Sequence, residues 1–258
     1  MGRARTEGSV SATELRVLPV EGLPEIEEGN RLGELIAARI DLEQGDVVVV
    51  SQKVVSKAES RVVQLSEVKP SERAQELAAQ LGKEPALVQL VLDECREVIR
   101  AERGVLICET RHGLVCANAG VDTSNVPRGS ASLLPLDPDA SARQIRAQLT
   151  QSSGESVAVV VSDSFGRAWR LGQCEVAIGC AGLRPLDDWR GRADAGGGTL
   201  TATAIAIADE AAAAADLARD KASGVPAAIV RGLERQVTED DGQGAASLRR
   251  SRDQDLFR

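Results

Sequence analysis

A short run of apolar residues, Val157–Val161, ends abruptly in a group of polar side chains. Such a run, rich in valine and bounded by polar residues, is typical of a strand that is buried on both faces of a sheet. Asp163 and Ser164 follow after Ser162, so we predict that they lie where the strand leaves the sheet. Layered α/β proteins collect ligands at this edge. Taken alone, Asp163 is better explained as the cap of a following turn.

Aromatic residues make up only 2% of the 258 residues, so the core has to be built from Val, Ile, Leu and Ala. A chain of this length can bury a substantial core without disulfides. The formal charge of −8 argues against sequence-independent nucleic-acid binding, which requires a basic surface. No apolar run reaches transmembrane length, so we expect no membrane partner and a cytoplasmic location. The five cysteines form no CxxC pair, which argues against a structural zinc site.

Strand-like and helix-like segments are interspersed along the whole chain. This order predicts an α+β fold, with mixed layers of helices and strands. Helices are expected at residues 27–40, 70–82, 85–95, 139–149 and 200–219. Strands are expected at residues 14–20, 47–50, 157–161, 174–181 and 226–230, with a hairpin formed by 98–109 and 113–116.

Two polar loops that follow predicted strands each offer a carboxylate, Asp122 and Asp163. If the two strands are neighbours, both carboxylates face one point. Oxygen ligands of this kind suit Mg²⁺ or Mn²⁺, and Ser164 adds a hydroxyl. Each aspartate taken by itself is also explained as an ordinary turn residue.

Two pairs of basic residues are candidates for binding phosphate or carboxylate groups. Lys53 and Lys57 follow the strand at 47–50, and their spacing places them on one face of either a strand or a helix. Arg167 and Arg170 follow Asp163 and form a second pair, which we expect to bind a substrate carboxylate. Solvated surface residues are the alternative interpretation of both pairs.

Several common catalytic motifs are absent from the sequence. There is no GxxxxGK[ST] loop and no GxGxxG segment after the first strand. His112 is the single histidine, so a Ser-His-Asp hydrolase and a multi-histidine metal centre are both disfavoured.

Taken in order, the motifs of this chain resemble those of the coenzyme F420-0:L-glutamate ligase family in its single-domain form. The resemblance covers roughly residues 14–240, which is nearly the whole chain. The matching segments are Gly22–Ile26, Lys53–Glu59, Asn118–Val126, Ser162–Arg170, Glu175–Gly191, Ala208–Glu210 and Gly224–Gly232.

The resemblance implies a GTP-dependent ligase that adds L-glutamate to coenzyme F420-0 through γ-glutamyl amide bonds, by way of an acyl phosphate. It also implies an F420 gamma-glutamyl ligase-like fold and an intertwined homodimer. Mg²⁺ or Mn²⁺ is the implied cofactor, with K⁺ as a further candidate. Residues 13–245 would form the ligase domain, either undivided or as two interleaved subdomains, between a disordered segment 1–12 and a charged tail 246–258.

The resemblance also assigns roles to individual residues. The metal would be held by Asp122, Asp163 and Ser164, and the catalytic residues would be Lys53, Lys57 and Arg167. One departure stands out, because Arg219-Asp220-Lys221 replaces a usual Met-Gly followed by Gln or Lys. The nucleotide would contact Gly22, Leu23, Pro24, Glu25, Gln52, Lys53, Lys57, Asn125, Arg219, Lys221 and Gly224.

Two other functions are compatible with the residues. One is an amide ligase or phosphotransferase that acts on a different carboxylate. The other is a non-catalytic nucleotide-binding protein, which would bind GTP or GDP without turnover.

Overall fold

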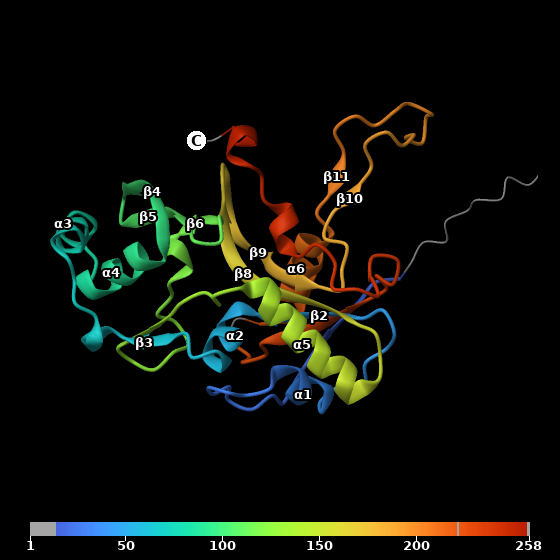
Figure 1. Ribbon diagram of the computed structural model, residues 1–258, viewed down its shortest axis with the longest axis horizontal. Coiled ribbons are helices and arrows are strands. Elements are labelled where there is room, and N and C mark those ends of the chain that lie inside the picture. Colours follow the sequence, from blue (N-terminus) through green and yellow to red (C-terminus); the bar gives the residue numbers. More distant parts are fainter. Residues whose placement is uncertain (1–13, 221, 257–258) are drawn as a thin grey trace, which may run out of the picture.

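The computed structural model describes residues 14–220 and 222–256 of the chain. The predicted disordered segment 1–12 lies outside the described residues. Helices and strands are combined in layers, so the predicted α+β class is confirmed (Figure 1).

The larger sheet has the strand order β1-β12-β2-β8-β9. Strands β2 and β8 run parallel to each other, and the other neighbours are antiparallel. The strands are β1 (Arg16–Pro19), β12 (Ala227–Arg231), β2 (Val47–Ser51), β8 (Ala158–Arg167) and β9 (Arg170–Ala181).

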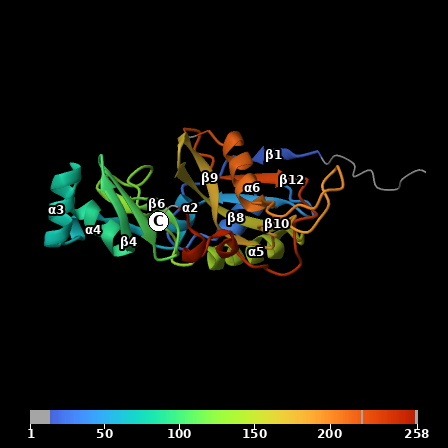
Figure 2. The same cartoon turned by 90° about the horizontal axis from the view of Figure 1, so that it is seen from above.

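Helices cover both faces of this sheet, which explains the valine-rich runs (Figure 2). Val48 and Val50 of β2 pack on one face in a cluster with helices α1 (Leu32–Ala37) and α5 (Pro138–Ser153). Val47 and Val49 point to the opposite face and pack against α6 (Ile207–Ala218). Because successive side chains of a strand alternate between faces, a strand buried on both sides must be apolar throughout.

The prediction that the strand ends before Asp163 is wrong. The parallel pairing of β2 with β8 does stop at Ser51 and Ser162, but β8 continues as far as Arg167. Strand β9 pairs with it antiparallel along this extension and supplies the backbone hydrogen bonds. Asp163 and Ser164 therefore lie in a long hairpin that projects beyond the parallel pair.

A second group of elements, from residues 62 to 133, has its own cluster of buried side chains. Helices α3 (Glu72–Leu81) and α4 (Pro85–Glu94) confirm the two predicted helices. The predicted strand 98–109 is divided into two at Arg103 and Gly104, which both have positive φ. The strands of this part are β3 (Val62–Gln64), β4 (Cys95–Glu102), β5 (Val105–Thr110), β6 (Val115–Ala117) and β7 (Ser130–Ser132).

Other boundaries differ from the predictions. The predicted helix 27–40 is helical only in α1, and the predicted helix 200–219 begins at Ile207. The residues before α6 instead form β11 (Ala204–Ile205), which pairs with β10 (Asp187–Asp188). The segment that carries Lys53 and Lys57 is a helix, α2 (Gln52–Ala58). Short 3₁₀ turns lie at Leu65–Glu67, Asn118–Gly120, Ala245–Leu248 and Arg252–Gln254.

None of the helices in the described ranges 14–220 and 222–256 combines the length and the apolar character that crossing a bilayer requires. The division of residues 13–245 into one domain or two interleaved subdomains stays a prediction.

Candidate functional site

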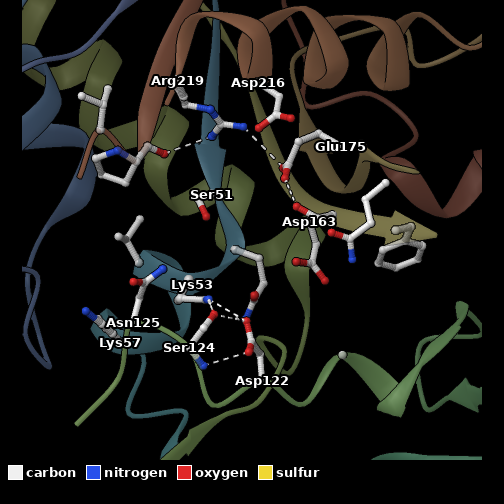
Figure 3. A pocket seen from close by; sticks show the side chains of 18 of the residues that line it. Ser51, Lys53, Lys57, Asp122, Ser124, Asn125, Asp163, Glu175, Asp216 and Arg219 are labelled. Carbon is white, nitrogen blue, oxygen red and sulfur yellow. Dashed lines mark hydrogen bonds and ion pairs between the residues drawn. The ribbon is translucent and has the colours of Figure 1, made fainter. Parts of the chain in front are cut away.

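A cavity of about 730 Å³ lies between the two groups of elements (Figure 3). Its walls come from the end of β2 and the start of α2, from the loop after β6, from the β8–β9 hairpin and from the segment after α6. Strand β6 does not belong to the sheet that contains β8, so the condition set by the sequence argument, that the two strands are neighbours in a sheet, is not met, although the strands do contact each other. Asp122 and Asp163 nevertheless line the same cavity.

Lys53 and Asp122 form the central charged pair of this cavity. The Nζ atom of Lys53 donates hydrogen bonds of 2.6 Å to Asp122 Oδ2 and to the hydroxyl of Ser124. The backbone N–H of Ser124 donates to Asp122 Oδ1 at 2.8 Å. Burial alone would raise the pKa of Asp122, but the hydrogen bonds from Lys53 and Ser124 outweigh it and lower the pKa.

The loop that carries Asp122 has an uncommon backbone conformation. Asn118, Ala119 and Gly120 all have positive φ, with values of 52°, 51° and 74°. A Cβ at Gly120 would lie 2.6 Å from Cγ of Leu134, so this position requires glycine. Asp122 then forms an antiparallel β-bridge with Ser132. The backbone N–H of each residue donates to the backbone carbonyl of the other. This strained turn fixes the direction of the carboxylate.

Asp163 faces Asp122 across the cavity and lies beside a further carboxylate, Glu175 (Figure 3). Burial and the negative charge of Glu175 together raise the pKa of Asp163 to about 7, and the charge of Asp122 adds to this rise. A group with such a displaced pKa in a cavity is a candidate for function.

Glu175 connects Ser164 to Arg219. It lies opposite Ser164 in the β8–β9 register, and the Ser164 hydroxyl donates to Glu175 Oε1 at 2.5 Å. The other carboxylate oxygen lies 3.4 Å from Nη2 of Arg219. Glu175 was not predicted as a site residue, although it opens the matching segment Glu175–Gly191.

Of the remaining residues predicted to contact the nucleotide, some line the cavity and others do not. Lys57 lines the cavity one helical turn after Lys53 and pairs with Glu25 at 2.5 Å. Gln52 also lines it, but its amide donates to Ser56 and to the carbonyl of Leu133. Lys221 lies outside the described residues. The cavity is also lined by Pro24, Glu25, Asn125, Arg219 and Gly224.

Three predicted residues do not line the cavity. Gly22 and Leu23 precede its wall, where the carbonyl of Gly22 accepts a hydrogen bond from Arg39 and Leu23 packs on the core. Arg167 is exposed near the tip of the β8–β9 hairpin, and its Nη2 donates to the carbonyl of Leu171. Its catalytic role stays a prediction.

The structure also adds residues that sequence reasoning missed. Ser51, Ser124, Glu175 and Asp216 all line the cavity. Ser124 lies inside the matching segment Asn118–Val126, so the resemblance could have identified it as a site residue. Asp216 carried no such signal, because it lies in an alanine-rich helix outside the quoted motifs.

The carboxylates of Asp122 and Asp163 are oxygen donors of the kind that a divalent metal accepts. Within the described part of the chain, no group of three or more His, Cys, Asp or Glu side chains is placed to hold a metal ion. Mg²⁺ seldom needs such a group, because it usually binds one or two carboxylates together with substrate phosphates and water. Asp122 and Asp163 supply those two carboxylates.

Comparisons with known proteins agree with the motifs. A family model described as F420-0:Gamma-glutamyl ligase matches residues 22–232. A protein of Methanothermobacter thermautotrophicus named Coenzyme F420:L-glutamate ligase is 43% identical over 250 residues, which cover 95% of this chain and 99% of that protein. Proteins with the same name from Archaeoglobus fulgidus and Methanopyrus kandleri are 44% and 42% identical over 246 residues. Each match covers 95% of this chain, and 96% and 98% of those proteins respectively. The resemblance found in the sequence is thereby confirmed.

Proposed function

Because this chain belongs to the F420-0:gamma-glutamyl ligase family, we propose that it joins L-glutamate to coenzyme F420-0 through γ-glutamyl amide bonds. GTP is the proposed phosphoryl donor. The observation that carries the proposal is the convergence of Lys53, Asp122 and Asp163 from three separate matching segments on one cavity.

The chemistry requires an activated carboxyl group, because a carboxylate is a poor acyl donor. We propose that the precursor carboxylate attacks the γ-phosphorus of GTP, so that GDP leaves and an acyl phosphate forms. The amine of glutamate then attacks the acyl carbon, phosphate leaves, and the amine gives up one proton. Both steps concentrate negative charge on phosphate oxygens, which cations must balance.

The lysines of α2 are the proposed source of that positive charge. Lys53 and Lys57 lie one turn apart, and their side chains are largely buried, with 18% and 15% exposed. Each is paired with a carboxylate in the absence of substrate, Lys53 with Asp122 and Lys57 with Glu25. We propose that both lysines turn toward the phosphates when the nucleotide binds.

Asp122 and Asp163 are the proposed ligands of Mg²⁺ or Mn²⁺. When bound, the metal would neutralise charge on the transferring phosphoryl group. The carboxylate of Asp163 lies beside that of Glu175 and faces that of Asp122 across the cavity, so a cation here would relieve the repulsion between them.

The test is to incubate the protein with F420-0, glutamate, GTP and Mg²⁺ or Mn²⁺ and to analyse the products by mass spectrometry. We expect product masses that increase by one glutamate residue each, with GDP formed in step. Omission of any one component should abolish the increments. Nucleotide turnover with a different carboxylate and none with F420-0 would contradict the proposed substrate, and binding without turnover would contradict catalysis.

We also propose that the protein acts as a homodimer, as the resemblance implies. Trp169 and Leu171 at the tip of the β8–β9 hairpin are 84% and 97% exposed, which is unfavourable for large apolar side chains in water. Light scattering coupled to size-exclusion chromatography should give twice the 27.2 kDa mass of the chain. A monomeric mass at micromolar concentration would contradict this.

A further inference from the structure

The three strands of the sheet β4-β5-β6 each carry a cysteine (Figure 1). Cys108 of β5 lies directly opposite Cys116 of β6. Cys95, the first residue of β4, lies opposite Thr110 of β5. Thr110 and Cys108 are two positions apart and therefore project from the same face, which makes Cys95 the diagonal neighbour of Cys108. All three cysteines are free thiols.

Cys95 and Cys108 touch each other but differ in their access to solvent. Cys108 is fully buried in the cluster of the second group of elements, and Cys95 is half-buried at the edge of that cluster. Burial raises the pKa of the Cys108 thiol, and a hydrogen bond with the thiol of Cys95 raises it further. An oxidant in solvent therefore reaches Cys95 first and finds a second thiol in contact with it.

The buried sulfur atoms also support the loop that carries Asp122. The backbone N–H of Ala119 donates a hydrogen bond to the sulfur of Cys108, and that of Gly120 donates to the sulfur of Cys116. Ala119 and Gly120 both belong to the turn with positive φ. Sulfur is a weak acceptor, and a turn of this kind is strained, so a displaced sulfur atom acts directly on the turn.

Neighbouring thiols are also typical of sites for soft metal ions. Within residues 14–220 and 222–256, however, no three His, Cys, Asp or Glu side chains are placed to hold a metal ion. Cys116 is also a poor partner for redox chemistry. Burial and then the negative charge of Asp163 raise its pKa to about 12, which keeps it in the unreactive thiol form.

We infer that Cys95 and Cys108 form a redox-active dithiol, whose oxidation to a disulfide by a peroxide releases the turn at Asn118–Gly120. The sulfur of Cys95 first attacks one oxygen of hydrogen peroxide, the O–O bond breaks, and one water leaves with the thiol proton. The sulfur of Cys108 then attacks the resulting sulfenic acid, the S–O bond breaks, and a second water leaves. Two thiols are thus oxidised to one disulfide, and hydrogen peroxide is reduced to two waters.

The local backbone allows this bond to form. The β4–β5 pairing shifts register between Cys95 and Glu97, so Cys95 is not held in a regular ladder. Because the two thiols are already in hydrogen-bond contact, a small movement brings the sulfur atoms to bonding distance. The new bond draws the sulfur of Cys108 toward Cys95 and away from the N–H of Ala119. Formation of the disulfide does not depend on the proposed function, whereas its effect on ligation does.

The test treats the full chain with hydrogen peroxide, alkylates the remaining thiols and maps the peptides by mass spectrometry. We expect a peptide pair joined through Cys95 and Cys108, lighter by two hydrogen atoms and separated again by dithiothreitol. Deuterium uptake of the peptide that covers residues 118–122 should rise about twofold on oxidation and fall again on reduction. Cys95→Ser should form no disulfide and show no rise. Cys174→Ser, which removes another half-buried thiol, is the matched control and should behave like the wild type.

A disulfide between Cys108 and Cys116, or oxidation of Cys95 to sulfinic acid without a disulfide, would overturn the inference. So would a Cys95–Cys108 disulfide with unchanged deuterium uptake at residues 118–122. The measurements on the wild-type chain decide the matter even where a variant does not fold. Cys108→Ala provides a second check, because it should leave Cys95 as a sulfenic acid that dimedone traps.

A parallel glutamate-addition assay separates this inference from the proposed function. Where the reduced protein ligates glutamate, the disulfide form should do so at least about tenfold more slowly, since Asp122 is no longer held in position. A disulfide with raised uptake in a protein that never ligates overturns the function and leaves the inference intact. Ligation by a protein that forms no such disulfide does the reverse. Undiminished ligation by the disulfide form would contradict the role proposed for Asp122.

Discussion

The Nζ atom of Lys53 lies 2.6 Å from Oδ2 of Asp122, although the two residues are 69 positions apart in the chain. The pair joins helix α2, which follows the central strand β2, to the loop that follows β6. It therefore brings a residue placed by the larger sheet into contact with one placed by the second group of elements.

Replacing Lys53 with methionine should lower kcat for glutamate addition by on the order of 10²-fold, because a cation at the phosphoryl group is lost. Methionine preserves most of the apolar stem, so the protein should still fold. The measurement is the steady-state rate of GDP release with F420-0 and glutamate present. Lys69→Met removes an exposed lysine away from the cavity and should leave the rate unchanged. Equal rates for Lys53→Met and wild type would show that Lys53 plays no part in catalysis.

Asp163→Asn should abolish most of the activity while leaving the fold intact. The change removes a proposed metal ligand but keeps the size of the side chain, and we expect a loss on the order of 10²- to 10³-fold in kcat. Circular dichroism should show an unchanged spectrum, and the Mn²⁺ affinity should fall together with the rate. A protein that only binds nucleotides would show no catalytic rate to lose, in the wild type or in the variant.

Much of the framework could be predicted from local sequence. The valine-rich runs identified β2 and the buried half of β8, since a strand covered by helices on both faces has no polar positions. Helix α3 could also be predicted from local residues. Ser71 caps its start by accepting a hydrogen bond from the N–H of Ala74, and Gly82 ends it in the left-handed conformation. Signals of this kind lie within a few residues of the element that they determine.

The sequence led to Asp122 and Asp163 in one cavity, but it missed the relationships that depend on strand pairing. Asp163 looked like the end of a strand because polar residues follow Val161. The continuation of β8 depends on hydrogen bonds from β9, which the residues of β8 cannot reveal. The contact of Ser164 with Glu175 depends on the register of this hairpin, and Trp169, with a φ of 59°, lies at its turn.

Close packing of β9 on α5 leads to a prediction about stability. A Cβ at Gly179 would be driven into the backbone carbonyl of Pro138, where helix α5 begins. We therefore expect Gly179→Ala to reduce the free energy of unfolding by about 1 to 3 kcal/mol. Gly166 lies in the same hairpin with open space around its Cβ position. Gly166→Ala is thus the control, and urea denaturation of both variants should show a lower midpoint for Gly179→Ala alone.

A second prediction about stability concerns pH. Asp209 of α6 accepts a hydrogen bond of 2.9 Å from the backbone N–H of Ala177 in β9. Burial raises the pKa of Asp209 above its ordinary value of 3.8, and the hydrogen bond from Ala177 offsets only part of that rise. The folded state therefore holds this proton more tightly than the unfolded state. The contribution of Asp209 to stability is fully present below pH 3.8 and is lost as the pH rises through the pKa of the folded state.

Asparagine at this position still accepts from Ala177 but does not ionise. The difference in melting temperature between Asp209→Asn and wild type should therefore grow in favour of the variant from pH 4 to pH 7. Asp93→Asn, an exposed position on α4, controls for the general change in charge. Melting curves recorded by circular dichroism at both pH values measure this difference. A difference that stays constant between pH 4 and pH 7, or shrinks, would mean that burial does not raise the pKa of Asp209.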